Sequence, residues 1–166
     1  DAEIIMIGKR GEAADFAKGH LGSNLERIVR ASHKPVFVAS RAFKPVSKIL
    51  VAYDGGASAM RAVDHIARSK LYAGLEAHIV TVGTPNAEVQ RGLKDAQAML
   101  KAAGMEATVG IIAGPAEQTL GDLVDENGYD LLVMGAYGHS RIRSLIIGST
   151  TTEMIRSCKV PVVLIR

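Results

Sequence analysis

Two glycines and a hydroxyl-bearing segment near the end of the chain have types and spacing that suit phosphate binding. Gly135 and Gly138 follow the apolar run Leu131–Met134, and nine residues then separate Gly138 from Gly148 and Ser149. Glycine lets a backbone turn sharply and approach a ligand closely. A helix that begins at Ser or Thr presents N–H groups and the positive end of its dipole. We therefore predict that an anion, the phosphate of a nucleotide, binds here.

Spacing alone leaves a second interpretation open, in which these glycines only make turns and a helix cap. The segment is neither a Walker A loop nor the dinucleotide fingerprint Gly-x-Gly-x-x-Gly. Arg141 and Arg143 lie between the glycines, where they could pair with phosphates or simply face solvent. No acidic partner for His139 can be located by spacing, so we assign no catalytic residue.

A carboxylate follows a second apolar run, at Asp54 after Lys48–Tyr53. It could accept hydrogen bonds from ribose hydroxyls or help to hold a divalent cation on phosphates. The alternative is that Asp54 only caps the next helix. Ligands of open α/β sheets bind beyond the carboxyl ends of the strands, where the strand order reverses. If the two runs form neighbouring strands, Asp54 and Gly135 border one crevice.

The bulk composition is that of a globular protein and narrows the classes of function. The chain has 166 residues, of which 48% are hydrophobic, and its net charge is +3. Its basic residues are not clustered, so composition does not indicate nucleic-acid binding. With Cys158 as the single cysteine, a disulfide within the chain and a cysteine metal site are excluded. We expect a reducing, cytoplasmic location.

The elements that must position these residues alternate between strand and helix. Such alternation predicts an α/β fold in which a parallel sheet carries helices on both faces. The predicted strands are 48–53, 77–82, 105–112, 131–134 and 160–165, with the third at an edge. Helices are predicted between them, the second opening at Pro85 and the last at Ser149–Ser157.

The beginning of the chain repeats the pattern of its end. We predict that residues 1–42 are the C-terminal strand-helix-strand fragment of a first domain, that 43–47 form a linker, and that 48–166 form a complete second domain. The repeat rests on a matching series: Gly8, Gly11, Gly22, Ser23, Arg30, Pro35 and Val36 correspond to Gly135, Gly138, Gly148, Ser149, Arg156, Pro161 and Val162.

Residues 48–166 resemble a universal stress protein domain, and the doubled pattern resembles the tandem form of that family. The resemblance rests on Ile49–Gly55, Leu132–Ser140, Gly148–Ser149 and Pro161–Ile165. It implies a Rossmann-like fold of the adenine nucleotide alpha hydrolase type, an open five-stranded parallel sheet in the order 3-2-1-4-5. Because the glycines are kept, it implies the branch of the family that binds ATP, with or without Mg²⁺.

The resemblance also implies which residues hold the nucleotide. Val82 would bind adenine through its backbone, and Thr150 would belong to a phosphate-side helix start that is rich in hydroxyls. The residues implied for ATP binding are Ala52, Asp54, Val82, Met134, Gly135, Tyr137, Gly138, Gly148, Ser149 and Thr150.

We interpret the chain as a nucleotide-responsive regulatory module of a stress response. One alternative is a weak ATPase or nucleotidyl-transfer enzyme that uses Asp54, a metal ion and Arg141 or Arg143. A second alternative is a nucleotide-free structural dimerisation domain. By resemblance, the strands Pro35–Ala39 and Val160–Ile165 pair at the interface of a homodimer or of a pseudo-dimer within one chain. We expect a protein partner that the sequence does not identify, and neither nucleic acid nor membrane.

Overall fold

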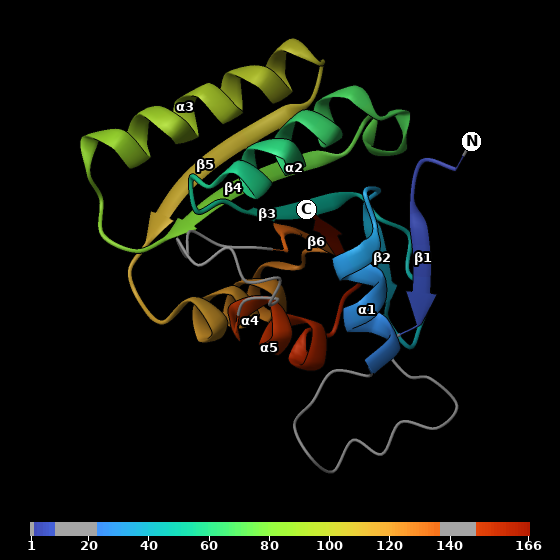
Figure 1. The fold of residues 1–166 in the computed structure, drawn as a ribbon. Helices are drawn as coiled ribbons and strands as arrows, with labels where there is room; N and C mark the ends of the chain where they lie inside the picture. The colour runs from blue at the N-terminus through green and yellow to red at the C-terminus, as the bar shows by residue number, and fades with distance from the viewer. Residues whose placement is uncertain (1, 9–22, 137–148) are drawn as a thin grey trace.

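The computed structural model describes residues 2–8, 23–136 and 149–166. These residues form one twisted sheet of seven strands in the order β1-β2-β7-β6-β3-β4-β5 (Figure 1). The strands are rich in β-branched and other apolar residues, as strands covered by helices on both faces require. They are β1 (Ile5–Gly8), β2 (Val36–Ala39), β3 (Lys48–Ala52), β4 (Glu76–Val82), β5 (Glu106–Ile112), β6 (Leu131–Gly135) and β7 (Val162–Ile165).

Helices cover both faces of the sheet and divide the core into two clusters. On one face, α2 (Ala57–Arg68) and α3 (Ala87–Ala102) pack on alternate strand residues such as Val51 and Val133. On the other face lie α1 (Ser23–Ala31), α4 (Ala116–Asn127) and α5 (Ser149–Ser157), which bury the intervening residues (Figure 1). Within the described ranges, no helix has the length and apolar character needed to cross a membrane.

The predicted α/β class and the predicted strand order hold within residues 48–166. Those residues supply β5, β4, β3, β6 and β7 in that spatial order, all parallel, which is the arrangement 3-2-1-4-5. The third of these strands, β5, is at the edge, as its alternating sequence predicted. The sheet does not stop at these five strands, because it continues past β7 into β2 and β1, the strands of the partial copy.

The continuation is made by an antiparallel pairing between β2 and β7. Val36 lies opposite Leu164 and Val38 opposite Val162, and all four side chains are buried. This pairing is the one that we expected between the strands at 35–39 and 160–165. β1 then pairs with β2 in parallel, so the N-terminal residues form the predicted strand-helix-strand unit.

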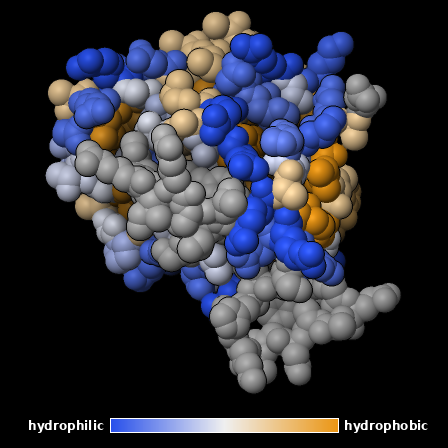
Figure 2. Space-filling view, viewed as in Figure 1, coloured by the Kyte–Doolittle hydropathy of each residue, from blue (hydrophilic) through white to orange (hydrophobic). Residues whose placement is uncertain are grey.

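The outer edge of β1 is apolar and lies at the end of the sheet. Met6 is 67% exposed, and Ile5 and Ile7 beside it are only partly covered. Hydrophobic atoms gather at the position of β1 in the space-filling view (Figure 2). A strand at the end of a sheet presents N–H and C=O groups that no neighbouring strand satisfies.

Helix boundaries differ from the predictions where side-chain capping decides them. Asn86, not Pro85, is the N-cap of α3, because its Oδ1 atom accepts a hydrogen bond from the N–H of Val89 at 2.9 Å. The helix after β3 ends at Arg68, and a short 3₁₀ turn, η2 (Lys70–Tyr72), follows it before the left-handed Gly74. α4 ends at Asn127, and its C-cap residue, Gly128, is left-handed with φ 66°.

A buried carboxylate fastens the segment between the two repeats to the sheet. The Oδ2 atom of Asp130 accepts hydrogen bonds from the N–H of Ser47 (3.0 Å), from the hydroxyl of Ser47 (2.9 Å) and from the N–H of Lys48 (3.1 Å). Its Oδ1 atom lies 2.9 Å from Nζ of Lys44. Burial opposes the charge, but these donors outweigh it and hold the pKa of Asp130 well below its usual range.

We predict that Asp130→Asn destabilises the protein by about 1–3 kcal/mol at pH 7, because an amide cannot accept all four contacts. Since the folded-state pKa is lowered, the contribution of Asp130 is complete above its unfolded pKa of about 3.9 and is lost as the pH falls towards the folded value. Urea unfolding at pH 7 and pH 3 should show the gap between wild type and variant narrowing in acid.

The matched control is Asp125→Asn, which removes an exposed pair with Lys159. We expect that change to cost less than about 1 kcal/mol. An equal cost for the two variants would contradict the special role of Asp130.

Candidate functional site

The predicted crevice lies where β3 and β6 end side by side and the order of the sheet reverses. Ala52 and Met134 are partners in the β3–β6 ladder and stand near the carboxyl ends of their strands. β3 is then anchored to β4 through Tyr53, whose N–H donates to the carbonyl of Val80 at 2.8 Å. The carbonyl of Tyr53 accepts the buried hydroxyl of Thr81 at 2.7 Å. These contacts fix the point at which the chain leaves the sheet.

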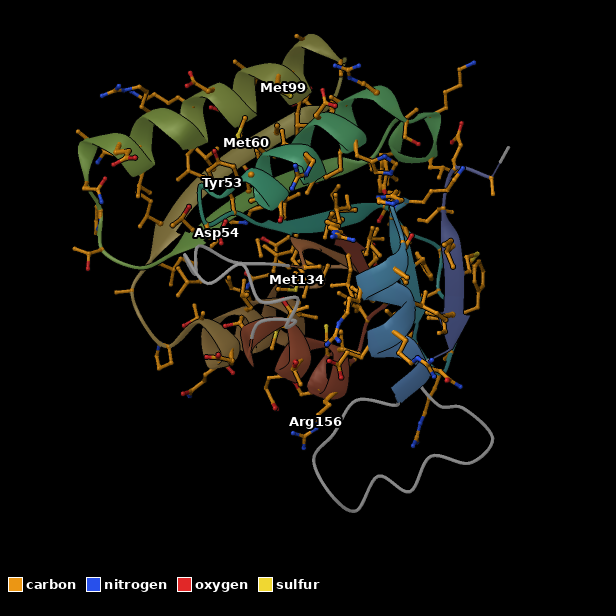
Figure 3. All side chains as sticks on the ribbon, viewed as in Figure 1. Tyr53, Asp54, Met60, Met99, Met134 and Arg156 are labelled. Atoms are coloured by element: carbon orange, nitrogen blue, oxygen red, sulfur yellow. The ribbon has the colours of Figure 1, made fainter. Side chains whose placement is uncertain are left out.

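Asp54 lies directly after that point and faces the start of α2. Its Oδ1 atom accepts the N–H of Gly56 at 2.8 Å, and the side chain is exposed at the end of β3 (Figure 3). Gly56 is the N-cap of α2 and offers no capping side chain. This contact is a turn from Asp54 to the N-cap residue, and no side chain caps α2, so the alternative that Asp54 only caps the helix does not hold. The carboxylate stays exposed at the carboxyl edge of the sheet.

The backbone N–H and C=O groups of Val82 face the side of the sheet on which β3 lies. In a parallel sheet, successive residues of a central strand direct their N–H and C=O groups to alternate neighbours. Val80 bonds towards β3, and the N–H of Gly83 donates to Ile112 on β5 at 2.9 Å. Val82 therefore faces the β3 side, where the strand has ended and the carbonyl of Tyr53 is already engaged. These two groups suit the edge of a planar heterocycle.

Gly135 occupies a position that excludes any side chain. A Cβ atom built on it would lie 2.7 Å from Cβ of Ser58 and 3.1 Å from the backbone N of Ala59. The first turn of α2 thus lies directly against the end of β6. Whether Gly135 binds a ligand or only makes a turn, the sequence predicted a position that needs a residue without a side chain. In the structure, that need comes from contact with α2.

The first turn of α5 reaches the same place from the opposite face of the sheet. The hydroxyl of Thr151 lies 3.4 Å from the carbonyl of Gly135 and 3.5 Å from that of Ala136. The starts of α2 and α5 therefore lie on opposite faces of the sheet at the end of β6. A helix start carries the positive end of the helix dipole, which favours a nearby anion.

The hydroxyl of Thr150 is engaged by a residue that sequence reasoning missed. It donates to Oε1 of Glu117 at 2.8 Å. Glu117 lies in the first turn of α4, and its pKa is lowered by a hydrogen bond from its own backbone N–H and by the Thr150 hydroxyl. The carboxylate therefore stays charged beside the start of α5.

Of the remaining predicted site residues, Met134 is buried, Ser149 begins α5, and the others lie outside the described ranges. The side chain of Met134 is 5% exposed and packs in the core, so only its backbone can border the crevice. Ser149 is the first residue of α5, and its side chain is not described. The other residues of the predicted phosphate segment lie outside the described ranges: Tyr137, Gly138, His139, Arg141, Arg143 and Gly148.

The described residues supply backbone groups and one carboxylate for a ligand, but not a metal cage. No set of three or more His, Cys, Asp or Glu side chains is grouped for a metal ion in the part of the chain that the structure describes. A divalent cation would have to be bound largely through phosphate oxygens and water, as Mg²⁺ commonly is. The described groups at this edge are therefore the helix starts, the carboxylate of Asp54 and the backbone of Val82.

Comparisons with known proteins decide the family. The model of the universal stress protein family matches residues 86–166. A curated universal stress protein from Synechocystis sp. is 45% identical over 168 residues, which cover all of this chain and 58% of the relative. The chain belongs to the universal stress protein family. It spans less than two thirds of the length of that relative.

Solved structures of the family share the fold. A universal stress protein from Archaeoglobus fulgidus matches with a TM-score of 0.75 and 28% identity, covering 99% of this chain and 60% of that one. A universal stress protein in complex with cAMP matches with a TM-score of 0.62 and 29% identity. That match covers 74% of this chain and 98% of the cAMP-bound protein.

We predict that Gly135→Ala destabilises the protein by about 1–3 kcal/mol, because the new methyl group must displace the first turn of α2. Adding Ser58→Gly should restore only part of the loss, since backbone atoms of Ser58 and Ala59 remain at 3.1 Å. Gly121→Ala is the control. A Cβ there meets nothing within 4 Å, and the change should stabilise α4 by about 0.5–1 kcal/mol. Urea unfolding measures all three, and a neutral Gly135→Ala would refute the contact.

Proposed function

We propose that this chain binds an adenine nucleotide, with ATP the expected one, and acts as a nucleotide-responsive regulatory module in a cytoplasmic stress response. The observation that carries the proposal is that two helix starts pack against Gly135, one on each face of the sheet, at the point where the strand order reverses. Thr151 brings α5 there and Ser58 brings α2. A site of this polarity at the carboxyl edge of a parallel sheet favours a phosphorylated ligand.

The proposed pose follows from the positions of the groups. Adenine lies against the backbone N–H and C=O of Val82, beyond the end of β3. The ribose hydroxyls donate to the carboxylate of Asp54, which is exposed at that edge. The phosphates extend towards the first turn of α5. The cAMP complex of a relative 29% identical to this chain supports an adenine ligand.

We further propose that residues 1–42 are the C-terminal part of a first domain with the same fold. The unit β1-α1-β2 repeats the unit β6-α5-β7 in element order and in parallel pairing. β6 has a parallel neighbour on its other side, which is β3. By the same plan, a strand equivalent to β3 would cover the apolar outer edge of β1. The last strands of the two units already meet, as β2 and β7 do.

Nucleotide binding can be tested directly by isothermal calorimetry with ATP. We expect binding by the wild-type chain and at least about tenfold weaker binding by Asp54→Ala, the loss of roughly one charged hydrogen bond. Asp122→Ala, an exposed carboxylate on α4, is the matched control and should bind as wild type does. Lack of binding by the wild type would reject the site. ATP hydrolysis abolished by Asp54→Ala would favour the enzyme alternative over regulation.

The absorbance spectrum gives an independent check on the nucleotide. The chain has no Trp and four Tyr, so a co-purified adenine would dominate near 260 nm. A protein-like spectrum together with no binding on titration would favour the alternative of a nucleotide-free structural domain.

The domain proposal predicts a pattern of amide hydrogen exchange along β1. The N–H of Ile5 donates to the carbonyl of Pro35, so alternate amides of β1 face β2. In this chain we expect the amide of Ile7 to be protected and that of Met6 to exchange quickly. In a longer chain that includes the preceding residues of the protein, Met6 should become protected. A longer chain in which Met6 still exchanges quickly would contradict the proposal.

A further inference from the structure

Glu117 and Thr150 connect the starts of the two helices that lie on one face of the sheet. Each is the second residue of its helix, Glu117 in α4 and Thr150 in α5. The Thr150 hydroxyl donates to Oε1 of Glu117 at 2.8 Å, and both side chains are only partly exposed. The two helices also pack against each other. A carboxylate is therefore held in a defined place beside the helix start at which we propose that phosphates bind.

The carboxylate at this place has an electrostatic consequence for any ligand. The negative charge of Glu117 is stabilised by the positive ends of the α4 and α5 dipoles, as the charge of a bound anion would be. A phosphate that approaches the start of α5 meets a fixed negative charge as well as the helix dipole. Repulsion between like charges grows with the charge of the ligand and falls with distance and with salt. A monophosphate and a triphosphate are thus affected unequally.

We propose that Glu117 shifts the preference of the nucleotide site towards ligands with fewer phosphate charges. Its carboxylate disfavours a triphosphate that carries no cation relative to a nucleotide with fewer phosphate charges. A divalent cation on the triphosphate reduces this penalty by neutralising part of the charge. The inference rests on the proposed function and deepens it, because it assigns the choice among adenine nucleotides to a residue of α4 outside the glycine-containing segment.

The test compares the affinities of AMP and ATP for the full chain by calorimetry in EDTA at low salt. Glu117→Gln keeps an oxygen that can accept from Thr150 but removes the charge. We expect it to tighten ATP binding by about two- to fivefold and to change AMP binding less. Repeating the titration at high salt should shrink the difference between wild type and variant. Adding Mg²⁺ should shrink it as well.

Two further variants separate charge from structure. Glu117→Ala removes the charge and the hydrogen bond together, and should shift the ratio of ATP to AMP affinity in the same direction as Glu117→Gln. Glu126→Gln makes the same chemical change near the far end of α4, where the side chain is exposed, and should leave the ratio unchanged. Urea unfolding of each variant confirms that the chain is folded.

The results that would contradict the role of Glu117 differ from those that would contradict nucleotide binding. Equal changes for ATP and AMP, weaker ATP binding by Glu117→Gln, or a shift that salt does not reduce would each overturn the role of Glu117 while leaving nucleotide binding intact. Absence of binding of either nucleotide by wild type and by every variant would instead reject the proposed function.

Discussion

The absence of a side chain at Gly135 is the constraint on which the arrangement of this edge depends. The start of α2 lies against it through Ser58, and the start of α5 lies over its carbonyl through Thr151. Helices on opposite faces of a sheet are normally kept apart by the side chains of the strand between them. Here the strand ends in a residue without Cβ, so one helix start can approach the backbone directly. The positive helix ends at this edge of the sheet are therefore a result of how α2 and α5 pack against Gly135.

The fold could be predicted from the sequence because strands that are buried on both faces are written as continuous apolar runs. Runs such as Leu131–Met134 are apolar at every position, which indicates a strand covered on both faces, and the structure buries all four residues. Turn chemistry marks several ends equally well, as Gly128 does for α4. What the sequence does not encode locally is the continuity of the sheet across β2 and β7. The repeat indicates two units, and the family resemblance was needed to expect that their last strands pair.

The candidate site is predicted less completely, because its decisive contacts join residues far apart in the chain. Ser58 is an ordinary small residue in a helical pattern, and its importance comes from Gly135, 77 positions later. Glu117 and Thr150 are 33 positions apart, and Ser47 and Asp130 are 83 apart. No periodicity links such pairs. The resemblance implied that the backbone of Val82 binds a ligand. The direction of its N–H and C=O groups can be inferred only from the hydrogen bonds that β4 makes with β3 and β5.

The antiparallel meeting of β2 and β7 has a geometric consequence for the whole sheet. Strands on the two sides of that seam point in opposite directions. The carboxyl ends of β1 and β2 therefore open on the edge opposite to the one where β3 and β6 end. In a protein with two such units, the two candidate sites would therefore open at opposite edges of the sheet. The units would be joined by the β2–β7 ladder and by a core cluster to which α1 and α5 both contribute.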